Sequence, residues 1–474
     1  MASSQQQQRQ GQGGGGLGSS LRKLKATSRG RRTSRAGPPS NSAAASHELN
    51  DKYMETMEEA FRSMGHSKEN IDIRDNRGSR GGGHVKKKQQ QPRRPPFKGG
   101  QIAEPSPGES GPQWQLPLGR GWTAGPRDPK GTTTIDLSDR PSLCMDMRKD
   151  SVVIGSSDHA LYEVNLSKGK RTRTLYSKAY GHAEWVNAVK YFPDGKVLSA
   201  GLDSKLLLWH ASAVRATELK GHSHSVSAID VSQDGGLACS CGYDKTIRFW
   251  SVAGLSGRET QCLRGHKAPI IEMAWRDAVL VSGSRDGTLI SWDVAQGKPM
   301  KREAVAHQGH IMALALAGDS ANAVSGGCLV LSGGQDGCLR VADHRMRSET
   351  PVFQRYHHRS GAGAGAVGAI RTTSAGLVLT MGADKRICVS DPRMDFEAVR
   401  IIESHEDFIY SMEVLENLVL SGSGDGKLLV HNLRTGERLY DLEGHQNAVR
   451  SLGVSEEALV ASGDDGNCVI YDMS

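Results

Sequence analysis

The stretch LVSGSRDGTLISWDV, residues 280–294, runs from a small-residue segment through an Asp-Gly turn into a second apolar segment that contains a tryptophan. The pair Gly265-His266 precedes it, so a histidine, a serine and an aspartate occur within about twenty residues. A hydrolase uses these residue types as base, nucleophile and orienting acid, but it needs them only once per active site. The meaning of the stretch therefore depends on whether it is repeated.

The aspartate turn of this stretch occurs eight times, at intervals of 40 to 50 residues. The equivalent residues are Asp158, Asp203, Asp244, Asp286, Asp336, Asp384, Asp425 and Asp465. Around each turn the chain reads as a short apolar strand, a small-residue strand and a β-rich strand such as TIRFWSV at residues 246–252. This pattern predicts an all-β repeat domain over residues 131–474.

Dipeptides at fixed places in the units point to a family. Gly-His occurs at Gly181-His182, Gly221-His222, Gly265-His266, Gly309-His310 and Gly444-His445, with Ser404-His405 as a variant, and Trp-Asp occurs at Trp292-Asp293. A period of about 40 to 45 residues with Gly-His early and Trp-Asp late resembles the blades of WD-repeat β-propellers. No specific member is identified. The resemblance implies a single β-propeller over residues 131–474.

The blade number follows from the length of the repeat region. Its 344 residues give about 43 per unit for eight blades, and we favour eight, with seven left open if the first unit packs irregularly. The last unit has only three strand-like segments, and TTTIDLS at residues 132–138 could supply the fourth. Such pairing would close the ring and remove its exposed edges.

In WD-repeat proteins the recurring histidine, serine, aspartate and tryptophan form a structural hydrogen-bond network, and three units here contain all four. These residues are His182, Ser199, Asp203, Trp209, His222, Ser240, Asp244, Trp250, His266, Ser282, Asp286 and Trp292. Buried polar groups are tolerated when they bond to one another. The resemblance therefore implies no catalytic residue, no metal site and no cofactor, and the protein is expected not to be an enzyme. Units after residue 300 lack the tryptophan, and we expect them to open first.

Partner contacts in WD-repeat families often come from residues three and five after the Gly-His histidine and from the residue before the turn aspartate. The larger side chains at these positions are Trp185, Asn187, Tyr243, Arg285, Phe408, Tyr410 and Arg450. Trp, Tyr and Arg dominate the energies of protein interfaces. The resemblance therefore implies a non-enzymatic scaffold that binds one or more proteins on this face.

Two other functions stay open. The segments ending in Arg345 and Arg393 resemble the W-D-x-R box of cullin-RING ubiquitin ligase substrate receptors, although they lack its tryptophan. The alternative is a scaffold for RNA-associated or ribosome assembly, because residues 1–130 have 23 basic against 11 acidic side chains. Such a segment attracts RNA and other polyanions.

The first 130 residues divide into three segments. Residues 1–45 are rich in Gln, Gly and Arg and are predicted to be disordered. Residues 46–65 have apolar side chains at helical spacing, which predicts a short amphipathic helix that docks on a partner or on the propeller. Residues 66–130 form a basic Gly/Pro-rich linker whose last part, with Trp114 and Trp122, resembles a strap over the propeller.

The cysteines and the hydropathy suggest a compartment. The eight cysteines include no C-x-x-C pair, and no apolar run reaches the roughly eighteen residues of a membrane span. We therefore expect an intracellular protein of the cytoplasm or nucleus, without a membrane partner. Cytoskeletal or ciliary association stays open, and an organelle transit peptide is a less favoured interpretation of the Arg- and Ser-rich start.

Overall fold

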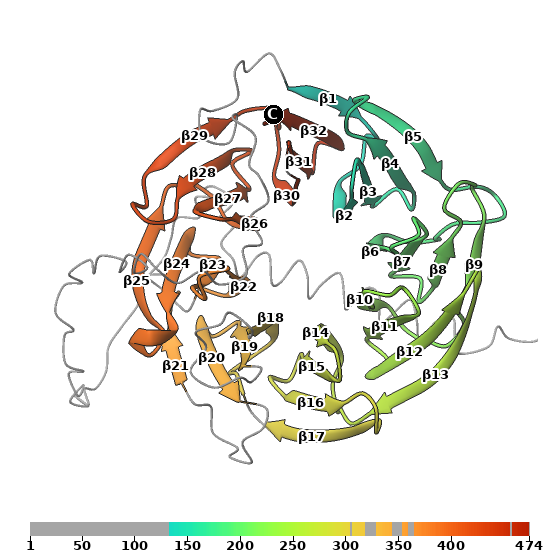
Figure 1. Ribbon diagram of the computed structural model, residues 1–474, viewed down its shortest axis with the longest axis horizontal. Coiled ribbons are helices and arrows are strands. Elements are labelled where there is room, and N and C mark those ends of the chain that lie inside the picture. The colour runs from blue at the N-terminus through green and yellow to red at the C-terminus, as the bar shows by residue number, and fades with distance from the viewer. Residues whose placement is uncertain are drawn as a thin grey trace, which may run out of the picture. The chain divides into compact units, whose positions relative to one another are not determined.

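The computed structural model describes residues 132–303, 306–317, 329–343, 353–358, 365–455 and 457–473. The predicted tail, helix, linker and strap, as well as Arg345, lie outside these residues. Within them, each run of four antiparallel strands forms one sheet, and eight such sheets, here called blades 1 to 8, stand around a ring (Figure 1). The predicted all-β propeller with eight blades is confirmed.

The strands of blades 1 to 4 follow one another along the chain. Blade 1 contains β2 (Ser142–Arg148), β3 (Ser151–Ser156), β4 (Leu161–Asn165) and β5 (Lys170–Leu175). Blade 2 contains β6 (Val186–Tyr191), β7 (Val197–Gly201), β8 (Leu206–Trp209) and β9 (Ala216–Glu218). Blade 3 contains β10 (Val226–Val231), β11 (Leu237–Gly242), β12 (Thr246–Ala253) and β13 (Ser256–Arg264). Blade 4 contains β14 (Ile270–Arg276), β15 (Val279–Ser284), β16 (Leu289–Asp293) and β17 (Lys298–Glu303).

Blades 5 to 7 have the same order, and blade 8 is composite. Blade 5 contains β18 (Ile311–Ala317), β19 (Leu329–Gly334), β20 (Cys338–Asp343) and β21 (Phe353–Tyr356). Blade 6 contains β22 (Val367–Thr372), β23 (Val378–Gly382), β24 (Arg386–Asp391), the 3-10 helix η2 (Pro392–Met394) and β25 (Glu397–Glu403). Blade 7 contains β26 (Ile409–Leu415), β27 (Leu418–Ser423), β28 (Leu428–Asn432) and β29 (Arg438–Leu442). Blade 8 contains β30 (Val449–Val454), β31 (Ala458–Gly463), β32 (Asn467–Asp472) and β1 (Thr133–Asp136).

Strand β1 closes the ring, as the sequence predicts. It pairs antiparallel with β32, from Thr133 opposite Ile470 to Asp136 opposite Asn467. Figure 1 shows this early strand lying against the last one, whereas every other blade is built from consecutive strands. The pairing covers the edge of β32 that would otherwise be open.

The recurring spacing of the units comes from one turn between the second and third strands of each blade. The turn aspartate accepts a hydrogen bond from the amide two residues later, for example at 3.1 Å in Asp203 and 2.9 Å in Asp425. The residue between them has a positive φ, as in Gly426 (79°) and Lys245 (66°). Aspartate closes such turns through its side chain, and glycine adopts positive φ at low cost. This explains why Asp-Gly recurs where the strands reverse.

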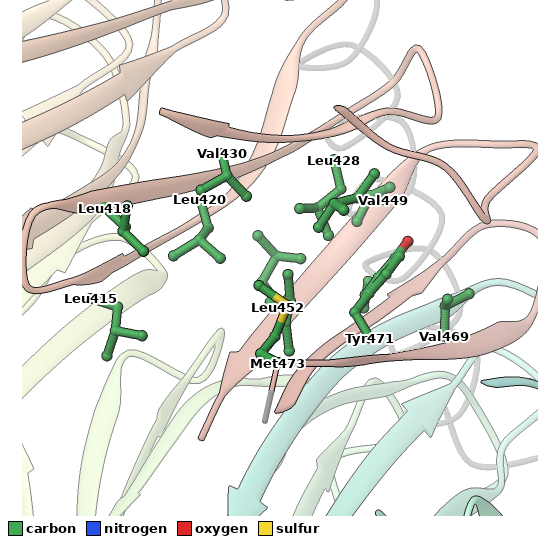
Figure 2. Packing of buried hydrophobic residues seen from close by; sticks show 13 residues of the cluster. Leu415, Leu418, Leu420, Leu428, Val430, Val449, Leu452, Val469, Tyr471 and Met473 are labelled. Carbon is green, nitrogen blue, oxygen red and sulfur yellow. The ribbon is translucent and has the colours of Figure 1, made fainter. Parts of the chain in front are cut away.

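The core lies between neighbouring blades rather than inside one of them. One cluster joins blade 7 to blade 8, and Figure 2 shows Leu420 and Val430 facing Leu452, Val469 and Tyr471 across the two sheets. All five side chains are buried. Each blade therefore depends on its two neighbours for burial, as expected when single repeats cannot cover their own apolar faces.

Candidate functional site at the turn-bearing face

Two of the three predicted four-residue networks form continuous hydrogen-bonded chains. In blade 3, Trp250 Nε1 donates to Ser240 Oγ at 2.9 Å, and His222 lies 2.7 Å from that oxygen through Nε2 and 2.8 Å from Asp244 through Nδ1. The equivalent distances in blade 2 are 2.8, 2.8 and 3.0 Å. Burial raises the pKa of Asp244, but hydrogen bonds from His222 and Thr246 outweigh it and hold the pKa at about 2.

Blade 4 differs at its aspartate. Ser282 Oγ lies 2.7 Å from His266 Nε2 and accepts from Trp292 Nε1 at 2.8 Å, as in the other blades. Asp286, however, is exposed, and its carboxylate accepts from the amide of Thr288 at 3.0 Å. The aspartate of this unit therefore closes its turn at an exposed position, and the charge of His266 also helps to lower its pKa.

The arrangement of serine, histidine and aspartate superficially matches a catalytic triad, but the serines are inaccessible. Ser199, Ser240 and Ser282 all have 0% relative exposure, and each accepts an indole hydrogen bond. A nucleophile must reach its substrate from solvent or from an open pocket. The geometry therefore fits a structural lock between strands.

Two expectations about the later units are wrong. The blade 5 histidine is His307, not His310: His307 lies 3.0 Å from Asp336 and 2.8 Å from Ser332. The segment AHQGH contains two histidines three residues apart, so the Gly-His dipeptide marked the wrong one. His310 instead accepts from Arg285 Nε at 3.3 Å on the turn-bearing face.

Blades 5 to 7 also keep more of the polar network than the missing tryptophan suggested. In blade 6, His358 lies 2.8 Å from Asp384 and 2.9 Å from Thr380, which takes the place of the serine. In blade 7, His405 contacts Asp425 and Ser421 at 3.3 and 2.8 Å. The missing tryptophan suggested that packing and ladder hydrogen bonds hold these blades more than the polar network does. That expectation needs correction, because the histidine keeps its contacts with the aspartate and with a serine or threonine.

The inner strand of every blade contains a β-bulge at the same place. The register of its pairing with the next strand skips one residue in each of the eight sheets. The skipped residues are Leu143, Asn187, Ser227, Ile271, Met312, Gly368, Tyr410 and Arg450. Bulges re-aim a side chain and are common beside binding sites. Here they form a ring next to the aspartate turns, and we call the ring together with the residues beside these turns the mouth.

Tyr410 and Arg450 contact each other in the mouth. The Arg450 guanidinium lies 4.2 Å from the centre of the Tyr410 ring and donates to both carboxylate oxygens of Asp464 at 2.7 Å. Burial works against the charged guanidinium, but Asp464 outweighs it and the pKa of Arg450 is raised. Because Tyr410 and Arg450 belong to adjacent blades, the pair also bridges blades 7 and 8.

The other predicted contact residues differ in how much of their side chain is exposed and in whether it already bonds within the propeller. Trp185, Tyr243 and Arg285 are half-buried and lie beside the turns of blades 2 to 4. Asn187 uses its amide to donate to the carbonyls of Val226 and Ser227 at 3.1 Å, so it ties blade 2 to blade 3.

Phe408 is only 7% exposed. The structure therefore brings Tyr410 and Arg450 together, places Trp185, Tyr243 and Arg285 on the same face, and gives Asn187 and Phe408 internal contacts. The skipped residues Leu143, Ile271 and Met312 were not selected from the sequence. Met312 is five residues after His307, so the correct histidine would have identified it.

Below the mouth, inner strands of several blades carry charged side chains that act on one another. Lys190 Nζ lies 3.2 Å from Asp146, and Arg371 donates to Glu413 at 2.9 Å. The charge of Arg371 in blade 6 also acts on Lys190 in blade 2 and on Glu272 in blade 4. Burial raises the pKa of Glu272 to about 7, against the hydrogen bond from the Met273 amide and the charge of Arg371.

The second arginine of the possible ligase-adaptor box lies away from the mouth. Arg393 is in η2, directly after β24, and its side chain is 57% exposed and pairs with Asp391 at 2.7 Å. The described residues contain no group of three or more His, Cys, Asp or Glu able to hold a metal ion. No helix in the described part of the chain is long and apolar enough to cross a membrane.

Comparison with known proteins assigns the class. The family model "WD domain, G-beta repeat" matches residues 169–210, 214–251, 257–293 and 436–472. Together with the eight blades, these matches support a WD-repeat β-propeller family for this chain. Solved structures match its fold: a computationally designed protein, Ika8, has TM-score 0.61 and 24% identity, covering 72% of this chain and 98% of that chain. Sqt1 of Saccharomyces cerevisiae has TM-score 0.63 and 15% identity, covering 72% and 97%.

Relatives of known name match only parts of the chain, at 30% identity or less. A ribosome biogenesis protein WDR12 homolog of Oryza sativa subsp. japonica is 23% identical over 53% of this chain and 64% of its own length. A CCR4-associated factor 4 homolog of Candida glabrata is 30% identical over 28% of this chain and 24% of its own length. The matches thus span less than two thirds of these relatives, and they identify no particular member of the family.

Proposed function

We propose that the protein is a non-enzymatic scaffold that binds a partner protein over the mouth of its propeller. The observation that supports this most directly is the ring of eight bulged residues, which includes Ile271, Met312, Tyr410 and Arg450. Aromatic and arginine side chains set among smaller apolar ones are typical of the energetic centre of an interface.

The contacts of the mouth divide it into a rigid part and an adaptable part. Asp464 and the Tyr410 ring hold the Arg450 side chain in place. A partner that binds the guanidinium of Arg450 or the ring of Tyr410 therefore causes little further loss of side-chain freedom. Trp185 and Tyr243, across blades 2 and 3, offer half-buried aromatic surface. A partner that touches both parts would span the mouth, whose rim is built from separate blades.

The test is affinity capture from cells with the full chain and with two surface variants, read by mass spectrometry. Replacing Tyr243 and Trp185 together by alanine should remove the specific partners, since truncating such anchors commonly costs 2 kcal/mol or more, roughly thirtyfold in affinity. Leu439→Ala is the matched control, because Leu439 is a 40% exposed side chain on the outer strand β29. Partners that are retained by the mouth variant, or that are lost equally from the control, would contradict the proposal.

A second candidate is a role in assembling RNA-containing particles. It is favoured by the excess of 23 basic over 11 acidic side chains in residues 1–130 and by relatives named as ribosome biogenesis proteins. Nuclease treatment before capture separates the two: partners held through RNA are lost, whereas partners held on the mouth remain. Polyanion binding through the tail should also weaken steeply with salt.

A cullin-RING substrate receptor remains a proposal with less support. Arg393 is exposed, but its guanidinium is paired with Asp391 within the same segment, and Ser390 stands where the box has tryptophan. Capture of a cullin adaptor that is lost in Arg393→Ala would establish this role. We also propose a cytoplasmic or nuclear location, since the seven described cysteines form no disulfide.

A further inference from the structure

The seam between blade 8 and blade 1 contains a groove on the side of the ring opposite the mouth. Its volume is about 910 Å³, and its apolar floor is formed by Met147, Leu166, Val454, Ala458 and Ile470. These residues come from the hairpin turns and strand ends of both blades. The groove is within the size range of pockets that bind ligands or side chains.

The floor of the groove is the uncovered part of a core cluster. The buried cluster of the seam includes Val152, Ile154 and Ile470, and Met147, Leu166 and Ala458 pack against it while only partly buried. A segment that covered those three side chains would bury them and enlarge the same core. Burial of apolar surface there would be favourable at about 25 cal/mol per Å².

The chain itself enters the ring at this groove. Thr133, the first residue of β1, lines it and lies opposite Ile470 in the pairing with β32. The residues immediately before Thr133 must therefore leave from its edge. Trp122 precedes Thr133 by eleven residues, and a chain of that length reaches up to about 36 Å.

We propose that the segment 114–131 of this chain occupies the groove and that the Trp122 indole covers its apolar floor. The indole is a large apolar body with one N–H donor, and the rim offers carboxylates at Asp150, Glu457 and Asp472. The segment itself contains three basic side chains and one acidic one. These charges complement a rim that has three carboxylates and two lysines.

Covalent attachment favours this occupant over a second copy or another protein. A short tether raises the effective concentration of a segment to the millimolar range without any association step. A separate molecule would have to overcome the loss of its translational and rotational freedom in order to fill the same groove. The segment 114–131 therefore loses less entropy on binding than a separate molecule does.

The direct test places the photo-crosslinker p-benzoylphenylalanine at position 122 of the full chain and maps the products by mass spectrometry. Crosslinks within one chain to peptides containing Met147, Leu166 or Ala458 are expected. The same probe in place of Phe97, an aromatic residue outside the segment, is the matched control and should give a lower yield in the groove. Crosslinks scattered over other blades, or formed between two chains, would overturn the proposal.

A blocking variant keeps the test decisive. Ala458→Arg fills the groove and should reduce the position 122 crosslink about tenfold, which corresponds to roughly 1.4 kcal/mol of lost docking. Circular dichroism must show the same β signal as the parent chain. If that signal is altered, Leu166→Ser replaces it as the blocking variant with the same expected loss. An unchanged crosslink yield in a folded blocking variant refutes docking in this groove.

Discussion

Ser240→Ala is the most informative single change in the propeller, because the Ser240 hydroxyl joins two other side chains, and one of them also contacts Asp244. The Asp244 carboxylate is a pure acceptor, so His222 donates to it from Nδ1 and accepts the Ser240 proton at Nε2 over 2.7 Å. Ser240 in turn accepts from Trp250 Nε1 at 2.9 Å. The bonds therefore run in one direction, from indole to carboxylate.

Removing the hydroxyl leaves an indole N–H and an imidazole nitrogen buried without their partner. An unsatisfied buried polar group costs about 1 to 3 kcal/mol, so the two together should lower the free energy of unfolding by roughly 3 kcal/mol. For a domain of this size that corresponds to a decrease in Tm of about 5 °C or more.

Thermal unfolding followed by circular dichroism measures this effect. Ser251→Ala is the control, since Ser251 is an exposed serine on the same strand as Trp250 and should leave the Tm unchanged. Partner capture should be retained by Ser240→Ala below its Tm. A Tm equal to that of the parent chain would show that the Ser240 bonds contribute nothing net and would refute the structural reading of the network.

Three further perturbations probe other parts of the ring. Ala461→Ser should raise the Tm by a few degrees, because His445 Nε2 is buried without a partner among the described residues and a hydroxyl there would add about 1 kcal/mol. Glu272→Gln should stabilise the protein increasingly as pH rises. The pKa of Glu272 in the folded chain is about 7, above its ordinary value of 4.5. The folded parent chain is therefore most stable below pH 4.5 and loses that stability as pH rises through 7. The variant should thus gain about 1 to 3 kcal/mol over the parent at pH 8 and little at pH 4.5, and a pH-independent difference in Tm would exclude the titration. Asp244 and Asp465 have the opposite sign: their pKa values, about 2, lie below 3.8, so their stabilisation is complete above pH 4 and is lost as pH falls toward 2. Their double replacement by asparagine should therefore reduce the dependence of Tm on pH between 4 and 2.

The blades of this protein are predictable from local spacing. Each turn aspartate bonds to the amide two residues later, so the turn is determined by neighbouring residues and is visible in the sequence. The closure by residues 132–138 is also predictable, since an incomplete last unit needs one more strand. His307 was missed because an alanine precedes it and a Gly-His pair follows three residues later. In the sequence, the histidine of the network was expected in a Gly-His dipeptide. In the structure, the histidine of the network is the one whose imidazole reaches Asp336 and Ser332.

The charges below the mouth were not predictable from spacing. Lys190 and Arg371 are 181 residues apart and belong to blades 2 and 6. Each is the single charged residue of its strand, and the closed ring brings their charges within reach of each other. Phe408 was misjudged for a similar reason: counting three residues from the histidine gives its position on the loop, but not whether its ring enters the core.

Pairing of β1 with β32 means that the ring is completed by the parts of the domain that are made first and last. During synthesis, Thr133–Asp136 emerges more than 300 residues before Asn467–Asp472. Blades 1 to 7 can form in order as they leave the ribosome, but β1 has no partner until the last repeat is released. Long-range pairing of this kind is slow and leaves strand edges open to misassembly. The growing chain therefore passes through an open-ring stage, at which general chaperones or a bound partner have the best opportunity to act on it.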